Sequence, residues 1–119
     1  MKLLPGLLFA TLTLGLPMLP GIAAAAGTVK TDAAKMTLYT FDKDKDGVPS
    51  CYQDCAKNWP PYLGKSSEKM GTGWKLVERT DKTMQWAYDG KPTYLFSGDK
   101  KPGDMTGDGK GGMWHALKE

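Results

Sequence analysis

Three runs of strand-forming residues, separated by turn signals, constrain the fold of this chain most strongly. They cover residues 74–79, 83–88 and 93–97. Alternating runs rich in β-branched and aromatic residues are typical of half-buried strands. The second and third runs are joined by a segment that opens with Asp89-Gly90, which favours a tight hairpin because glycine accepts positive φ. The pattern predicts an antiparallel β meander and therefore a mainly β fold.

The remaining segments predict short elements joined by loops. Residues 50–59 favour a short helix, because Ser50 can cap its start and Pro60-Pro61 must end it. Met36-Thr37-Leu38-Tyr39-Thr40-Phe41 alternates in the manner of a strand. The other expected elements are a closing strand at 113–117 and polar loops at 42–49 and 98–112.

The first residues have the pattern of a secretory signal peptide. Lys2 precedes an apolar run over residues 3–22, and small residues follow at 23–27. A basic start, an apolar middle and small residues at an A-x-A site are the three parts of such a signal. The alternative is a membrane-spanning helix, but the prolines and glycines within the run argue against a stable span of about 20 residues. We expect a signal peptide at 1–26, cleaved near Ala24–Ala26, and export to the bacterial periplasm or the extracellular space.

The mature chain, residues 27–119, is long enough for one core and too short for two domains. The full chain carries a formal charge of +3, and lysines and carboxylates alternate along it rather than forming a basic block. A nucleic-acid surface needs a clustered basic face, so we expect no nucleic-acid partner. No second long apolar run follows the signal, so we expect no membrane span after its removal. An envelope protein remains a possible partner.

Cys51 and Cys55 are the only cysteines of the chain. In an oxidising compartment such a pair usually forms a disulfide, which is the first interpretation. The alternative adds His115, the only histidine. Two thiolates and one imidazole suit copper or zinc by ligand softness, so the three side chains are a candidate metal or thiol-redox site.

An acidic loop offers a second candidate metal site. The run Asp42-Lys43-Asp44-Lys45-Asp46-Gly47 follows the D-x-D-x-D-G pattern that opens a calcium loop. Alternate carboxylates, those of Asp42, Asp44 and Asp46, would converge on one point, and the glycine allows a sharp turn. The motif excludes a complete EF-hand, because its twelfth position is Gln53 instead of a bidentate glutamate. A partial calcium site stays open.

One motif occurs twice. Both copies read Tyr-x-Phe-x-x-Asp, a strand with two aromatic residues that runs into an acidic turn. The six residues are Tyr39, Phe41 and Asp44 in the first copy and Tyr94, Phe96 and Asp99 in the second. Two copies in one small domain indicate two related halves, which we place around residues 36–63 and 74–117.

These residues resemble the Lipoprotein_15 family, the secreted repeat of unknown function, whose bacterial secreted proteins and lipoproteins carry a Tyr-x-aromatic-x-x-Asp motif, often in tandem. The resemblance extends over nearly the whole mature chain, although the chain lacks a lipoprotein cysteine. Further segments similar to the family are Cys51-x-x-x-Cys55-Ala56, Trp59-Pro60-Pro61, Trp86-x-Tyr88-x-Gly90-x-Pro92, Pro102-Gly103-Asp104 and Gly111-Gly112-Met113-Trp114-His115. The resemblance implies a secreted protein with no established activity.

No sequence motif indicates catalysis. The chain has no Gly-x-Ser-x-Gly, no phosphate-binding loop and no His-Glu-x-x-His. We therefore expect a non-enzymatic envelope module that binds a ligand or a protein. The alternatives are a copper or thiol-redox protein that uses Cys51, Cys55 and His115, and a structural surface domain stabilised by calcium.

Overall fold

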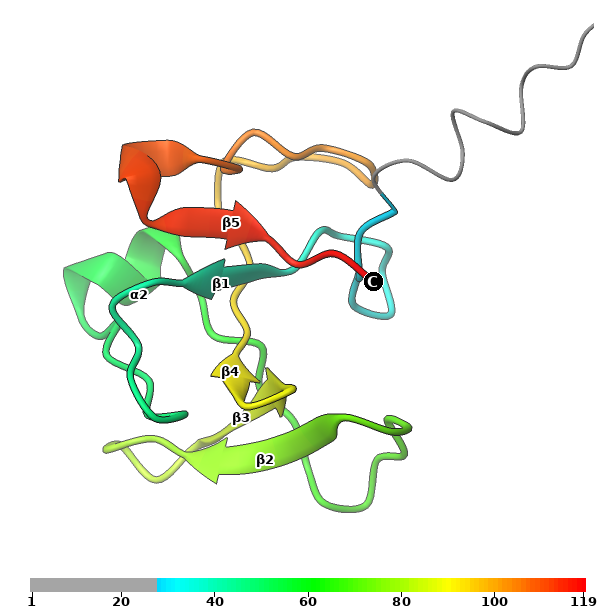
Figure 1. The fold of residues 1–119 in the computed structure, drawn as a ribbon, viewed down its shortest axis with the longest axis vertical. Helices are drawn as coiled ribbons and strands as arrows, with labels where there is room; N and C mark the ends of the chain where they lie inside the picture. The colour runs from blue at the N-terminus through cyan, green and yellow to red at the C-terminus, as the bar shows by residue number, and fades with distance from the viewer. Residues whose placement is uncertain (1–27) are drawn as a thin grey trace, which may run out of the picture.

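This computed structural model describes residues 28–119, so the predicted signal peptide lies outside the described residues. Two small antiparallel sheets form the domain, one above the other in Figure 1, with a short helix beside them. The first sheet pairs β1 (Tyr39–Phe41) with β5 (Trp114–Ala116). The second has the order β2 (Trp74–Glu78), β3 (Met84–Tyr88), β4 (Lys91–Pro92). The mainly β fold and the predicted meander are thus confirmed.

The third strand of the meander was predicted at 93–97 but lies at Lys91–Pro92, within the predicted turn. Asp89 and Gly90 join β3 to β4 with φ angles of 53° and 83°, which is the two-residue hairpin turn that Asp-Gly favours. Of the predicted strand 93–97, Thr93 still donates its backbone N–H to the Trp86 carbonyl of β3 at 2.9 Å, but the next residue turns away. Tyr94 instead exchanges two backbone hydrogen bonds with Tyr39, at 2.8 and 2.9 Å. Its backbone groups therefore serve the other sheet, and the meander ends at Pro92.

The helix is also shorter than predicted. It is α2 (Asp54–Asn58), and no side chain caps its start. Ser50 was expected to cap it but instead donates both its backbone N–H and its hydroxyl to Asp44, each at 2.8 Å. The prediction that Pro60-Pro61 ends the helix agrees with the structure, where the helix stops at Asn58. A 3₁₀ turn, η1 (Lys110–Gly112), lies within the predicted loop 98–112.

Among residues 28–119, no helix combines the length and the apolar character that a membrane crossing needs.

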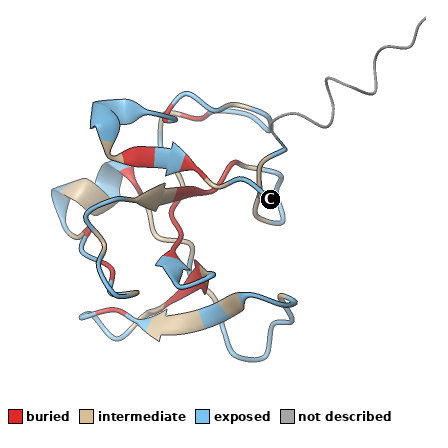
Figure 2. Ribbon diagram, in the orientation of Figure 1, coloured by how far each residue is buried: buried red, intermediate tan, exposed pale blue. Residues whose placement is uncertain are grey.

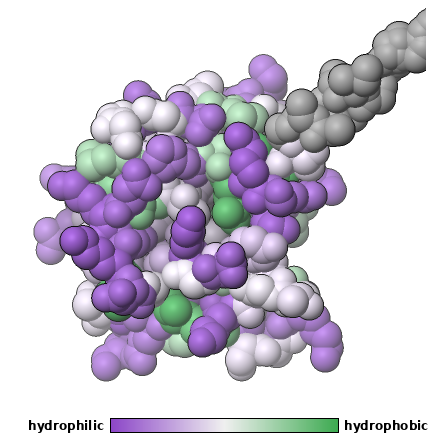
Figure 3. Space-filling view, in the orientation of Figure 1, coloured by the Kyte–Doolittle hydropathy of each residue, from purple (hydrophilic) through white to green (hydrophobic). Residues whose placement is uncertain are grey.

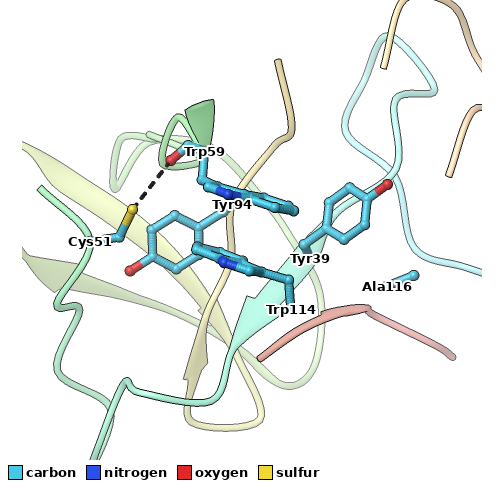
Figure 4. Packing of buried hydrophobic residues seen from close by; sticks show 6 residues of the cluster. All are labelled: Tyr39, Cys51, Trp59, Tyr94, Trp114 and Ala116. Atoms are coloured by element: carbon cyan, nitrogen blue, oxygen red, sulfur yellow. Dashed lines mark hydrogen bonds between the residues drawn. The ribbon is translucent and has the colours of Figure 1, made fainter. Parts of the chain in front are cut away.

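Four stacked aromatic rings form the centre of the core. The indoles of Trp59 and Trp114 lie face to face, with centroids 3.8 Å apart and an angle of 1° (Figure 4). Phe96 extends the stack beyond Trp59, at 4.2 Å, and Phe41 extends it beyond Trp114, at 4.0 Å. Large aromatic side chains supply much of the apolar burial available to a domain of this size. In Figure 2 the buried segments gather in the middle of the molecule.

The two halves of the chain repeat these contacts at a spacing of 55 residues. Tyr39 and Tyr94 are one such pair, and Trp59 and Trp114 are another. Tyr39 meets the edge of Trp59 at 5.3 Å, and Tyr94 meets the edge of Trp114 at 5.2 Å, from opposite sides of the stack (Figure 4). The core is therefore approximately two-fold symmetric.

Each half is completed by the other. Asp42 donates its backbone N–H to the Met113 carbonyl, and Ser97, 55 residues later, donates its own to Asn58, both at 2.8 Å. In the same way, β1 of the first half pairs with β5 at the end of the second half. The tyrosine segment of each half thus pairs with the tryptophan segment of the other half.

Candidate functional site

The repeated motif joins the two halves through reciprocal hydrogen bonds. The Tyr39 hydroxyl donates to Asp99 Oδ2 at 2.7 Å, and the Tyr94 hydroxyl donates to Asp44 Oδ2 at 2.8 Å. The tyrosine of each copy therefore binds the aspartate of the other copy. The tyrosine and aspartate of one copy do not pair with each other. The structural role of the motif is therefore to hold the two halves together.

The second oxygen of each aspartate holds the loop that follows it. Asp44 Oδ1 accepts from the backbone and hydroxyl of Ser50, and Asp99 Oδ1 accepts from the backbone and hydroxyl of Thr106, at 2.9 and 2.6 Å. Each carboxylate thus fixes its own loop with one oxygen and the opposite half with the other. Satisfying both oxygens offsets the desolvation of the carboxylate in the interior.

Burial shifts the ionisation of this network. It raises the pKa of the Tyr39 and Tyr94 hydroxyls well above that of an exposed tyrosine, and the neighbouring carboxylates add to the effect. Burial also raises the pKa of Asp44, although its bonds from Ser50 and Tyr94 and the charge of Arg79 act in the opposite direction. Both tyrosines therefore remain neutral donors at physiological pH.

The raised pKa of Asp44 gives a pH prediction. The folded chain binds the Asp44 proton more tightly than the unfolded chain, so ionisation of this carboxyl destabilises the fold. The loss begins near the ordinary aspartate pKa of about 3.9 and is complete above the folded pKa. Asparagine does not ionise, so Asp44→Asn should gain stability relative to the unaltered chain as the pH rises through this window.

Urea unfolding of the unaltered chain and of Asp44→Asn, from about pH 3 upward in steps of about one pH unit, measures the difference in their free energies of unfolding. Asp54→Asn is the matched control, because the Asp54 side chain on α2 is 99% exposed. A difference for Asp44→Asn that stays flat, or that moves in the opposite direction with pH, contradicts the prediction.

The two cysteines form the predicted disulfide, with Cα atoms 5.3 Å apart. Cys51 is fully buried, and its sulfur lies 3.9 Å from the Trp59 carbonyl oxygen (Figure 4). The Cys51 carbonyl accepts a 2.7 Å hydrogen bond from Arg79, whose guanidinium also donates to Gln85 Oε1 at 2.7 Å. Arg79 is only 4% exposed and lies over the Tyr52 ring. This residue therefore ties the disulfide segment of the first half to the hairpin of the second.

A groove of about 840 Å³ opens between the two sheets. Its volume falls within the range of small-molecule sites in proteins. Thr40–Gly47 of the first half form one wall, and Gly73–Val77 with Ala87–Pro92 of the second half form the other, each range contributing some of its residues. The apolar part of the lining is Phe41, Trp74, Val77, Ala87 and Pro92.

Charged side chains of both signs line this groove. The carboxylates are those of Asp42, Asp44, Asp46 and Asp89, and the ammonium groups are those of Lys75 and Lys91. Four carboxylates against two lysines give a formal charge of −2 (2 − 4), whereas the full chain carries +3. Asp46, Asp89 and the two lysines make no side-chain hydrogen bond or ion pair with the rest of residues 28–119. These four groups are therefore available to a ligand.

A much smaller counterpart of this groove lies at the related position, beside Phe96 and Asp99 of the second half. Phe96, Asp99 and Thr37 line a pocket of about 160 Å³, in places equivalent to Phe41, Asp44 and Pro92. There Thr37 donates its hydroxyl to the Asp104 carbonyl at 2.7 Å. The larger groove has an additional wall from β2, formed by Trp74, Lys75 and Val77. Only one of the two related positions is thus enlarged.

The candidate metal ligands point to different partners. His115 Nε2 lies 2.8 Å from Asp42 Oδ2, while Cys51 and Cys55 are joined to each other. Asp44 binds Ser50 and Tyr94, and Asp46-Gly47 form a tight turn closed by the Val48 N–H and the Lys45 carbonyl at 2.9 Å. Residues 28–119 contain no group of three such side chains arranged to hold a metal ion. The copper and calcium sites stay predictions from the sequence.

The sequence reasoning missed Arg79 and the second wall of the groove. A signal for Arg79 was present, since it is the only arginine in a chain that otherwise uses lysine for every basic charge. Arginine is favoured over lysine where a buried cation must donate several hydrogen bonds in fixed directions. Nothing in the sequence distinguished Lys75, Asp89 and Lys91 as groove residues, because charged residues at these strand and turn positions look the same when they simply face solvent.

Comparison with known proteins agrees with the two related halves. A family model described as a secreted repeat of unknown function matches residues 22–62 and again residues 75–118. No curated protein and no solved structure matches the chain. The two matched segments cover most of the chain, and each contains one copy of the Tyr-x-Phe-x-x-Asp motif. This chain therefore belongs to the Lipoprotein_15 family of secreted repeats.

Proposed function

We propose that this chain is a binding module of the bacterial periplasm or extracellular space, and that the groove between the sheets takes a ligand with a cationic group. The observation that carries the proposal is the groove itself, about 840 Å³ in volume and lined by apolar surface and unpaired charges. The secreted family supports an extracytoplasmic site of action. The signal-like first residues support it independently.

The charge of the groove supports a cationic ligand. Asp46 and Asp89 are exposed and have no partner in the described part of the chain, so a ligand ammonium or guanidinium group can pair with them without displacing an internal contact. Trp74 and Phe41 contribute aromatic rings to the lining, and aromatic rings attract cations in addition to supplying apolar area. The two lysines would favour a ligand that also carries an anionic group. A short basic peptide with a free carboxylate has all three features.

Trilysine is a suitable probe, with triglutamate as the matched control peptide. Titration of ¹⁵N-labelled protein with trilysine should shift the amide signals of the groove walls, those of Asp46, Gly47, Trp74 and Asp89 included. Triglutamate should leave these signals in place. Shifts that scatter over the whole surface, or equal shifts with both peptides, would contradict the proposal.

Removing the two unpaired carboxylates should weaken trilysine binding. Exposed charge pairs contribute about 0.2–1 kcal/mol each, so Asp46→Asn with Asp89→Asn should raise the dissociation constant about 2- to 30-fold. The control removes two carboxylates outside the groove, those of Asp54 and Glu119, as Asp54→Asn with Glu119→Gln. Because both double variants change the net charge equally, an equal loss of affinity would show a general charge effect instead of a groove site.

A further inference from the structure

The groove and the core are built from both halves of the chain. One groove wall comes from residues 40–47 and the other from residues 73–92. The four stacked rings also alternate between the halves, in the order Phe41, Trp114, Trp59, Phe96. Both Tyr–Asp hydrogen bonds cross from one half to the other. Neither half therefore has a closed core by itself.

We propose that each half can bind the opposite half of a second copy of this chain, giving a dimer with two composite grooves. Every contact named above would form again in such a dimer, because the first half of one copy presents to the second half of its partner the same surface that it presents to its own. Exchange of identical elements between protomers is a low-cost route to dimers. The length of the connector between the halves decides which form is populated.

The connector runs from Gly64 to Gly73 across the three-stranded sheet. Gly64 donates to the Met84 carbonyl on one edge of β3, and the Gly73 carbonyl accepts from Asp89 on the other edge. Across the sheet, the two glycines are two strand spacings apart, about 10 Å. Along the direction of β3, they are offset by the five residues from Met84 to Asp89, about 17 Å. The straight-line separation of the two glycines is therefore about 20 Å. The intact connector has nine residue-to-residue steps between Gly64 and Gly73, which reach about 30 Å when fully extended. The intact chain can therefore close on itself.

A shortened connector should force the exchange. Deletion of residues 66–70 leaves four steps between Gly64 and Gly73, which reach about 14 Å and cannot bridge about 20 Å. The deletion variant should elute as a folded dimer, with twice the monomer mass by light scattering. The control replaces residues 66–70 by five Gly or Ser residues. It loses the same side chains, among them the Glu68 carboxylate that accepts from Trp86 Nε1, and should remain a monomer.

A mixing experiment distinguishes exchange from side-by-side association. One deletion variant carries Trp59→Ala in the first half, and the other carries Trp114→Ala in the second half. Only in an exchanged mixed dimer does one folding unit receive both unaltered halves and an intact ring stack. Unfolding and refolding the two variants together should therefore restore a cooperative unfolding transition that neither variant shows alone.

The proposal is overturned if the deletion variant is a folded monomer, if it fails to fold at any concentration, or if the mixture recovers no transition. These measurements use mass and unfolding as readouts and no ligand, so they are independent of the proposed binding function.

Discussion

Trp59→Ala is expected to remove a large share of the stability of this domain. Trp59 is 6% exposed and lies between Trp114 and Phe96, with stacking distances of 3.8 and 4.2 Å. Truncation of a buried tryptophan to alanine typically lowers the free energy of unfolding by about 3–5 kcal/mol, through lost apolar burial and the cavity that remains. Small domains are stable by only about 5–15 kcal/mol in total. The variant should therefore be largely unfolded at moderate urea concentrations.

Urea unfolding followed by circular dichroism measures this loss. Trp114→Ala should show a loss of similar size, because Trp114 is 5% exposed and has the equivalent place in the stack, between Trp59 and Phe41. Trp74→Ala is the control, since Trp74 lies on the groove at intermediate exposure and should be tolerated better. A loss below about 1 kcal/mol for Trp59→Ala would show that the stack is not the main source of stability.

Tyr39→Phe is expected to lower the free energy of unfolding by about 1.5–3 kcal/mol, the range for a hydrogen bond to a charged group. Tyr39 is completely buried and Asp99 is 7% exposed, so the carboxylate has little access to water when its donor is removed. The Gly107 N–H, which donates to the Tyr39 hydroxyl at 3.2 Å, would lose its partner as well. The variant keeps the ring and its packing, so the loss isolates the hydroxyl.

Tyr94→Phe is the matched comparison and should cost less. Its partner Asp44 is at intermediate exposure, whereas Asp99 is buried, so water can replace the lost donor more easily at Asp44. Thermal unfolding of the two variants gives the order of their effects. The double variant Tyr39→Phe with Asp99→Asn should lose less than the sum of its single losses, because the two side chains share one hydrogen bond. Equal effects of the two tyrosine variants would mean that burial of the carboxylate does not set the cost. Additive losses in the cycle would mean that the Tyr39–Asp99 hydrogen bond does not contribute to stability.

Local signals predicted the strands and turns well. Asp89-Gly90 forms the predicted hairpin turn. Asp46-Gly47, interpreted from the sequence as part of a calcium loop, also has two positive φ angles, 55° and 76°. β2 and β3 begin and end within one residue of the predicted runs. Their formation depends on the φ preference of glycine and on alternation along a few residues, and both are properties of neighbouring positions in the sequence.

Other segments were predicted less well, because distant residues decide their conformation. Residues 93–97 alternate like a strand, but Tyr94 pairs with Tyr39 rather than continuing along β3. Ser50 has the chemistry of a helix cap, but Asp44 offers it a carboxylate six residues earlier. In both cases a hydrogen-bond partner outside the local window replaced the one that the local pattern suggested.

The sequence by itself determined the β class and the family and gave the Cys51–Cys55 disulfide as its first interpretation, because each depends on residue types at short, fixed spacings. It also showed two copies of one motif. Only the tertiary structure decided that the tyrosine of each copy binds the aspartate of the other, and that the groove lies between the halves. A repeated motif is equally compatible with pairing within a copy and between copies. The choice depends on which arrangement buries both tyrosines and satisfies both carboxylates at once, and that is a property of the packed core rather than of either segment.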